Sequence, residues 1–120
     1  MANEKLKSKL NELKDNGFFD NLVIRRGIEK EFFRVDSDGY ISKSSHPDSL
    51  GSALTNKFIT TDFAEAQLEL VTPVFEDIDS LYDFLYSLHV FVGQNIEDDE
   101  MLWPFSMPPK IKNESDINLG

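Results

Sequence analysis

The sequence predicts a single α+β domain in which a helix covers a sheet. Residues 28–35 are rich in β-branched and aromatic side chains, and residues 65–74 alternate charged or polar with apolar side chains; both patterns are typical of strands. Residues 78–92 repeat apolar side chains every three or four positions, which is typical of an amphipathic helix. The chain has 120 residues and therefore suits one domain.

The first predicted element is a helix at residues 3–16, in which Leu6, Leu10 and Leu13 form one apolar stripe. We expect this helix to pack against the domain or to cap it. Gly17 directly follows this segment, and glycine is common just after the end of a helix.

The strand at residues 28–35 should form a hairpin. Residues 36–39 (Asp-Ser-Asp-Gly) predict a turn, and residues 40–42 predict the returning strand. Residues 43–57 mix Ser, His, Pro, Gly and Asn and predict a long loop. Loops of this length in compact domains are often functional.

Two more extended segments, residues 58–61 and 65–74, precede the clearest helix of the chain. Its apolar stripe consists of Ile78, Leu81, Leu85, Leu88 and Val92. Phe84 and Phe91 widen the stripe, so this helix should cover a sheet. The acidic run at residues 97–100 should be a solvated turn, and residues 102–109 predict an irregular aromatic segment.

Composition excludes several classes of function. The chain has 22 acidic and 12 basic side chains, a net charge of −10, which argues against nucleic-acid binding and against a basic membrane-surface helix. It has no Cys, which excludes disulfides, thiolate nucleophiles and cysteine zinc sites. No apolar run approaches the ~18–20 residues of a membrane span, and the charged N-terminus is unlike a signal peptide. We therefore expect a soluble, cytoplasmic protein.

Paired carboxylates are the strongest chemical signal. Alternate residues of a strand share a face, so Glu29 and Glu31 should project together, as should Glu65, Gln67 and Glu69. If the two strands are neighbours, these carboxylates converge. Negative charges at such short distances either raise the pKa of one carboxyl group or recruit a cation. Oxygen ligands without Cys suit Mg²⁺ or Mn²⁺.

The same alternation also fits a half-buried sheet that faces water, and the pattern leaves both interpretations open. Asp62 lies close enough to the second strand to add another oxygen ligand. Residues 58–109 contain eleven acids and no Lys or Arg that could neutralise the group. The pattern therefore favours metal-assisted phosphoryl chemistry, although it names no substrate.

The remaining polar candidates are expected to be structural. His46 lies in a loop and His89 in a helix, and neither belongs to a nucleophile motif. Arg25, Arg26 and Arg34 could contact phosphate, but in so acidic a chain we expect them to pair with carboxylates.

Four segments together carry a family resemblance. They are residues 27–35 (GIEKEFFRV), 46–55 (HPDSLGSALT), 58–74 (FITTDFAEAQLELVTPV) and 103–108 (WPFSMP). In this order they resemble motifs of the bacterial, proteobacterial-type glutamate–cysteine ligase family (γ-glutamylcysteine synthetase). One position departs from the pattern, because Pro109 stands where the family often has Cys.

This resemblance implies a fold similar to glutamine synthetase, in which an antiparallel sheet with covering helices holds magnesium ions on acidic side chains. By motif position the metal ligands fall on Glu29, Glu31, Asp62 and Glu69, and Glu65 is expected to be a supporting acid. The implied reaction joins the γ-carboxylate of L-glutamate to the amine of L-cysteine, through a γ-glutamyl phosphate made with ATP. It is the first step of glutathione biosynthesis.

Chains of this family are several times longer. We therefore expect residues 1–120 to be the N-terminal segment of one ligase catalytic domain, a fragment that is inactive alone. Two alternatives remain: a truncated, non-catalytic binding or regulatory module of the same family, or an acidic interaction domain. The sequence predicts no oligomeric state.

Overall fold

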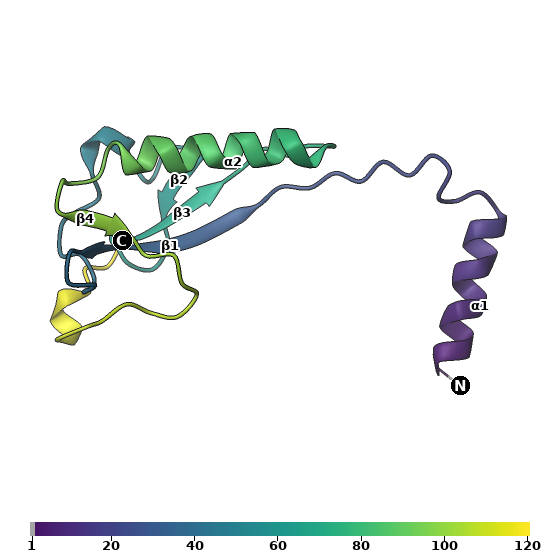
Figure 1. The fold of residues 1–120 in the computed structure, drawn as a ribbon, viewed down its shortest axis with the longest axis horizontal. Helices are drawn as coiled ribbons and strands as arrows, with labels where there is room; N and C mark the ends of the chain where they lie inside the picture. The colour runs from purple at the N-terminus through teal and green to yellow at the C-terminus, as the bar shows by residue number, and fades with distance from the viewer. Residues whose placement is uncertain (1) are drawn as a thin grey trace.

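The computed structural model describes residues 2–120, which contain a four-stranded antiparallel sheet and two α-helices (Figure 1). In chain order the elements are α1 (Ala2–Asp15), β1 (Glu29–Asp36), η1 (Asp48–Leu50), β2 (Ile59–Thr61), β3 (Gln67–Val71), α2 (Ile78–Gly93), β4 (Glu100–Leu102) and η2 (Glu114–Asp116). The predicted α+β class is confirmed. Within residues 2–120, no helix is both long enough and apolar enough to cross a bilayer.

The sheet has the strand order β2-β3-β1-β4, and α2 covers one of its faces (Figure 1). The core lies between them. Leu68 and Leu70 of β3 are fully buried and pack in one cluster with Phe32 of β1 and Val92 of α2. The alternation of buried and half-buried residues along β3 confirms the predicted apolar face of this strand.

Asp77 caps the N-terminus of α2, because its Oδ1 accepts a 2.7 Å hydrogen bond from the Ser80 N–H. Leu81 and Val92 are buried as predicted. Ile78 was predicted to belong to the core stripe, but it is 65% exposed, because the first turn of α2 extends beyond the sheet (Figure 1).

The cap at Asp77 gives a pH-dependent prediction. The hydrogen bond from Ser80 lowers the pKa of Asp77 from its ordinary value of 3.8. A lowered pKa stabilises the fold above the ordinary value, and this contribution is lost as the pH falls through the lowered pKa. Asp77→Ala should therefore lower the melting temperature at pH 7 by roughly 2–6 °C.

Circular dichroism at several pH values measures this effect. The difference between wild type and variant should disappear once Asp77 is protonated. Asp83→Ala, in the exposed middle of α2, is the matched control and should cause no loss; an equal loss in both variants would contradict the capping role.

The helix at residues 3–16 is present as α1, but the expectation that it packs on the domain is wrong. None of its residues is buried, and Leu6 and Leu10 are 59% and 47% exposed. Residues 16–28 carry α1 away from the sheet (Figure 1), so its leucine stripe does not pack on the sheet.

The turn predicted at residues 36–39 is confirmed. Gly39 has φ 80°, and Asp36 Oδ1 accepts hydrogen bonds from the N–H groups of Asp38 and Tyr40. The returning strand is reduced to single bridges, one of which joins Ile41 to Val35. The returning strand cannot extend further along this edge of β1, because residues 29–33 of β1 already pair with β3.

The acidic run is only partly the solvated turn that was predicted. Glu97, Asp98 and Asp99 are exposed, but Glu100 begins β4 and its side chain is only 4% exposed. β4 was not predicted from the sequence. It pairs with Arg34–Asp36 of β1. The polar tail also contacts the domain, since residues 118–120 hydrogen-bond to residues 63 and 65.

Candidate functional site

The predicted acidic residues lie together on the face of the sheet opposite α2. Glu31 of β1 is directly opposite Glu69 of β3, and Glu29 lies two residues earlier on the same face of β1. Asp62 follows β2 and extends its ladder, because the Asp62 N–H donates a 2.9 Å hydrogen bond to the Gln67 carbonyl. Thr60, two residues earlier, is opposite Glu69, which places Asp62 on this face too.

Glu69 is the carboxylate that the other three acidic residues influence. The pKa of Glu69 is raised from its ordinary value of 4.5, first by burial and then by the negative charges of Glu29, Asp62 and Glu31. The structure thus places all four predicted ligands on one face of the sheet, with Glu69 between the others.

The metal role itself remains a prediction. Among residues 2–120, no three His, Cys, Asp or Glu side chains are close enough to form a metal site by themselves. Mg²⁺ does not require such a cage, because it commonly keeps several waters and uses one or two carboxylates together with substrate phosphates. The facing pair Glu31 and Glu69 fits this mode, and the donors are all oxygen. One oxygen of Glu31 accepts a 3.0 Å hydrogen bond from Gln67 Nε2, which orients the carboxylate.

The nearest lysine does not neutralise the acidic face. Lys30 lies between Glu29 and Glu31 in sequence, so its side chain projects to the opposite face, toward α2. There its Nζ is 2.8 Å from His89 Nε2. His89 Nδ1 donates to the Leu85 carbonyl at 2.9 Å, which leaves Nε2 to accept from the ammonium. His89 therefore has the structural role that was predicted.

Within residues 2–120, two of the three arginines pair with carboxylates as predicted, and Arg26 does not. Arg25 pairs with Glu76 at 3.1 Å on the surface, and Arg34 pairs with Glu100 at 2.7 Å in the interior. In the described part of the chain Arg26 makes no ion pair, and its backbone pairs with Phe75. His46 Nε2 lies 3.0 Å from the Gly51 carbonyl, within the predicted loop.

Two hollows border the acidic face. One, of about 350 Å³, is lined by Glu29 among others, and the other, of about 260 Å³, has Glu31, Phe105 and Ser106 in its wall. The aromatic segment thus covers one end of the acidic face. The position of Phe105 and Ser106 beside Glu31 was not predicted, although both residues lie in the motif at residues 103–108.

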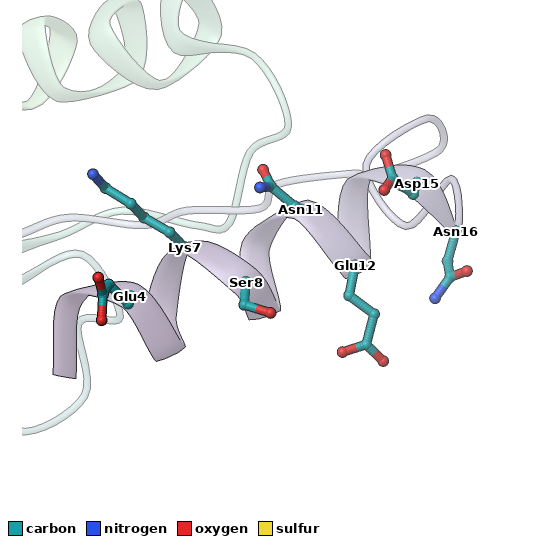
Figure 2. A pocket seen from close by; sticks show the side chains of 7 residues that line it. All are labelled: Glu4, Lys7, Ser8, Asn11, Glu12, Asp15 and Asn16. Atoms are coloured by element: carbon teal, nitrogen blue, oxygen red, sulfur yellow. The ribbon is translucent and has the colours of Figure 1, made fainter. Parts of the chain in front are cut away.

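A larger hollow, of about 710 Å³, lies along α1 (Figure 2). Figure 1 shows that α1 is separated from the sheet. Its lining residues are Glu4, Lys7, Ser8, Asn11, Glu12, Asp15 and Asn16. All belong to α1 or the residue after it, so no second element closes the space. Binding sites enclose most of their ligand, and a single helix face cannot do so. We therefore place the functional site on the sheet.

Comparison with known proteins identifies the relationship. A sequence model of the glutamate–cysteine ligase family matches residues 9–120. The chain belongs to the glutamate–cysteine ligase family. Glutamate–cysteine ligases from Yersinia pseudotuberculosis and Erwinia tasmaniensis are 53% and 51% identical to it over 97 residues, 81% of this chain.

Two solved structures share the fold. A crystal structure of glutamate–cysteine ligase from Francisella tularensis in complex with AMP superposes with a TM-score of 0.75 at 44% identity, over 78% of this chain and 18% of that one. A bifunctional glutathione synthetase from Pasteurella multocida gives a TM-score of 0.74 at 36% identity, over 78% and 13% of the two chains. The chain also spans only 18% of the length of the Yersinia and Erwinia ligases.

Proposed function

We propose that this chain supplies the N-terminal part of the catalytic domain of an ATP-dependent glutamate–cysteine ligase. The observation that carries the proposal is the acidic face, where Glu31 lies opposite Glu69 and Glu69 also lies within electrostatic reach of Glu29 and Asp62, in a chain of this family. The AMP bound to the Francisella ligase supports the use of a nucleotide. L-glutamate and L-cysteine follow from the family name.

In the proposed reaction, a γ-carboxylate oxygen of L-glutamate attacks the terminal phosphorus of ATP, and ADP leaves. The amine of L-cysteine then displaces phosphate from the γ-glutamyl phosphate, losing a proton as the amide bond forms. Bringing a carboxylate to a triphosphate is electrostatically unfavourable, and bound Mg²⁺ reduces this repulsion. Glu29, Glu31, Asp62 and Glu69 would hold the magnesium.

The carboxylates of this chain would position the ion, and the paired strands β1 and β3 keep three of them in register. Because the chain spans only 18% of its curated relatives, we propose that it provides part of the site and does not turn over alone. Sites for the nucleotide base and for cysteine would lie largely in the remainder of such a protein.

The test compares the 120-residue chain with the longest chain encoded at the same locus. Phosphate release is measured with ATP, Mg²⁺, L-glutamate and L-cysteine. We expect turnover only in the longer chain, and a loss of roughly 100-fold or more in its Glu29→Gln variant.

Glu97→Gln is the matched control, because Glu97 is an exposed acid outside the acidic face, and turnover should be unchanged. A folded longer chain that releases no phosphate would overturn the catalytic proposal and favour a binding module. Equal losses of turnover in Glu29→Gln and Glu97→Gln would contradict a catalytic role of the acidic face.

A further inference from the structure

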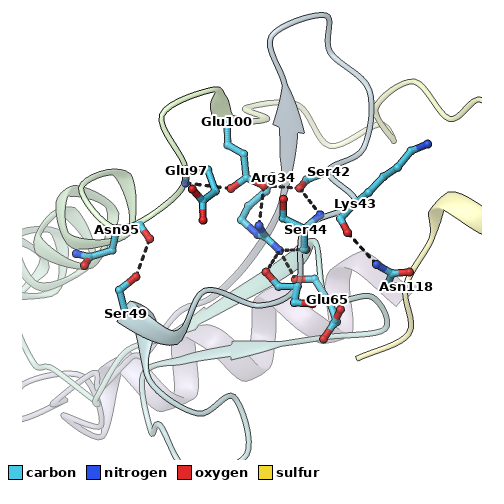
Figure 3. Close-up of polar contacts among 11 residues, drawn as sticks. Arg34, Ser42, Lys43, Ser44, Ser49, Glu65, Asn95, Glu97, Glu100 and Asn118 are labelled. Carbon is cyan, nitrogen blue, oxygen red and sulfur yellow. Dashed lines mark hydrogen bonds and ion pairs between the residues drawn. The ribbon is translucent and has the colours of Figure 1, made fainter.

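Arg34 has an unusual position for an arginine, because it is completely buried in β1. Its guanidinium reaches four partners (Figure 3). Nη1 donates to Glu100 Oε1 at 2.7 Å, and Nη2 donates to the carbonyls of Ser44, Ser45 and Glu65 at 2.8, 3.1 and 3.2 Å. One side chain therefore joins β1 to the loop after the hairpin, to β4 and to the segment before β3.

The contact with Glu65 matters for the acidic face. Three of the four carboxylates lie on β1 and β3, whose ladder fixes their positions. Asp62 differs, because it lies in the short connection between β2 and β3. This connection is held by hydrogen bonds from the N–H of Asp62 to the carbonyl of Gln67 and from the N–H of Gln67 to the carbonyl of Ala64, at 2.9 and 2.8 Å.

Arg34 holds the same connection from the side of β1. Besides the guanidinium contact with the Glu65 carbonyl, the Arg34 N–H donates to the Ala66 carbonyl at 2.8 Å. Glu100 in turn fixes the guanidinium, and Ser42 Oγ donates to the same carboxylate oxygen. Because Arg34, Ser42 and the side chain of Glu100 are buried, they have few alternative arrangements.

We propose that Arg34 is a positioning residue, which, held by Glu100, orients the Asp62–Gln67 connection and so places Asp62 on the acidic face, near Glu69. The expected effect of Arg34 on metal binding rests on the proposed function. The expected effect of Arg34 on the conformation of the Asp62–Gln67 connection does not rest on it. Arg34 itself lies in the interior and would not touch the ion or the substrates.

Arg34→Lys is the main test variant. Lysine keeps the positive charge near Glu100, but its single ammonium cannot reproduce the fork that reaches a carboxylate and three carbonyls. Glu100→Gln is the milder second variant, because it keeps an oxygen acceptor for Arg34 and removes only the charge. It keeps the test possible if Arg34→Lys folds poorly.

The first measurement needs no metal. Amide hydrogen exchange by NMR compares Asp62 and Gln67, in the connection, with Val71 and Thr72, which bond to Phe58 and Ile28. We expect protection of the first two amides to fall about tenfold in Arg34→Lys and about threefold in Glu100→Gln, while Val71 and Thr72 change less. Equal loss at all four amides in both variants, or no loss, would overturn the proposal.

The second measurement uses Mn²⁺ as the probe, with free Mn²⁺ measured by electron paramagnetic resonance. Asp62→Asn should weaken Mn²⁺ binding about tenfold in the wild-type background and less than twofold in Arg34→Lys, because Asp62 is already misplaced there. Glu29→Gln should weaken Mn²⁺ binding by the same factor in the wild-type and Arg34→Lys backgrounds. An undiminished effect of Asp62→Asn in Arg34→Lys would overturn the proposal.

The two measurements separate the two proposals. If the wild-type chain and the longer chain both fail to bind Mn²⁺, the proposed metal function fails. Hydrogen exchange still decides whether Arg34 positions the connection.

Discussion

Arg34→Met should lower the free energy of unfolding by about 3–5 kcal/mol, because it leaves a buried carboxylate without its cation. The side chains of Arg34 and Glu100 are 0% and 4% exposed, so water cannot replace the lost partner. Domains of this size have total stabilities of about 5–15 kcal/mol, so the variant should be close to unfolding. Urea titration followed by circular dichroism measures the loss.

Arg25→Met is the matched control. Arg25 also pairs with a glutamate, at 3.1 Å, but both side chains are more than 60% exposed. Removing this exposed pair should cost less than about 1 kcal/mol. Similar losses in the two variants would mean that the Arg34–Glu100 pair is not buried in solution.

A double variant separates the pair from its surroundings. Arg34→Met combined with Glu100→Leu removes both charges, and an apolar pair of similar volume often restores stability. The double variant should therefore be more stable than Arg34→Met. It should still lack the orientation of the Asp62–Gln67 connection.

Glu69→Gln should have two opposite effects, a gain in stability and a loss of metal binding. The pKa of Glu69 is raised by burial and by the neighbouring carboxylates. A raised pKa means that the contribution of Glu69 to stability is complete below its ordinary value and is lost as the pH rises through the raised value. Glutamine cannot ionise, so at pH 7 without divalent cations the variant should be more stable by about 0.5 kcal/mol.

The gain in stability of Glu69→Gln over the wild type should become smaller as the pH falls and the wild-type carboxyl becomes protonated. With Mg²⁺ present the order should reverse, because the ion stabilises the folded wild type by mass action. We expect Mn²⁺ or Mg²⁺ affinity to fall roughly tenfold or more, which corresponds to about 1.4 kcal/mol. Thermal unfolding with and without Mg²⁺, at pH 4 and pH 7, measures both effects.

Glu97→Gln again serves as the control for charge alone, since it removes one negative charge from an exposed turn. It should change neither the stability without metal nor the response to Mg²⁺. If Glu69→Gln keeps the full Mg²⁺ response, the acidic face does not bind the ion through this residue.

Local pattern was enough to predict much of the sheet and its two chemically different faces. Alternation is a property of each strand, so the buried positions Leu68 and Leu70 and the outward Glu69 could be read from β3 alone. The helical period likewise predicted α1 and α2. The four acidic residues could be grouped because they lie near one another in two short segments.

Contacts between distant segments were not predictable in the same way. The pairing of Arg34 with Glu100 joins residues 66 positions apart, and neither residue carries a local signal of burial. The short strand β4 depends on pairing with β1, because three residues have too little pattern to predict a strand. The exposure of α1 depends on what lies beside it, which an amphipathic stripe does not specify.

The sequence by itself therefore determined the α+β class, the acidic face and the family, because these depend on periodicity and on motifs read along the chain. Only the tertiary structure decided that Glu31 faces Glu69, that Lys30 lies on the other face with His89, and that Arg34 holds the connection carrying Asp62. The physical reason is that register and burial arise from long-range pairing. In that pairing hydrogen bonds and desolvation across the sheet select one arrangement among many that the local pattern allows.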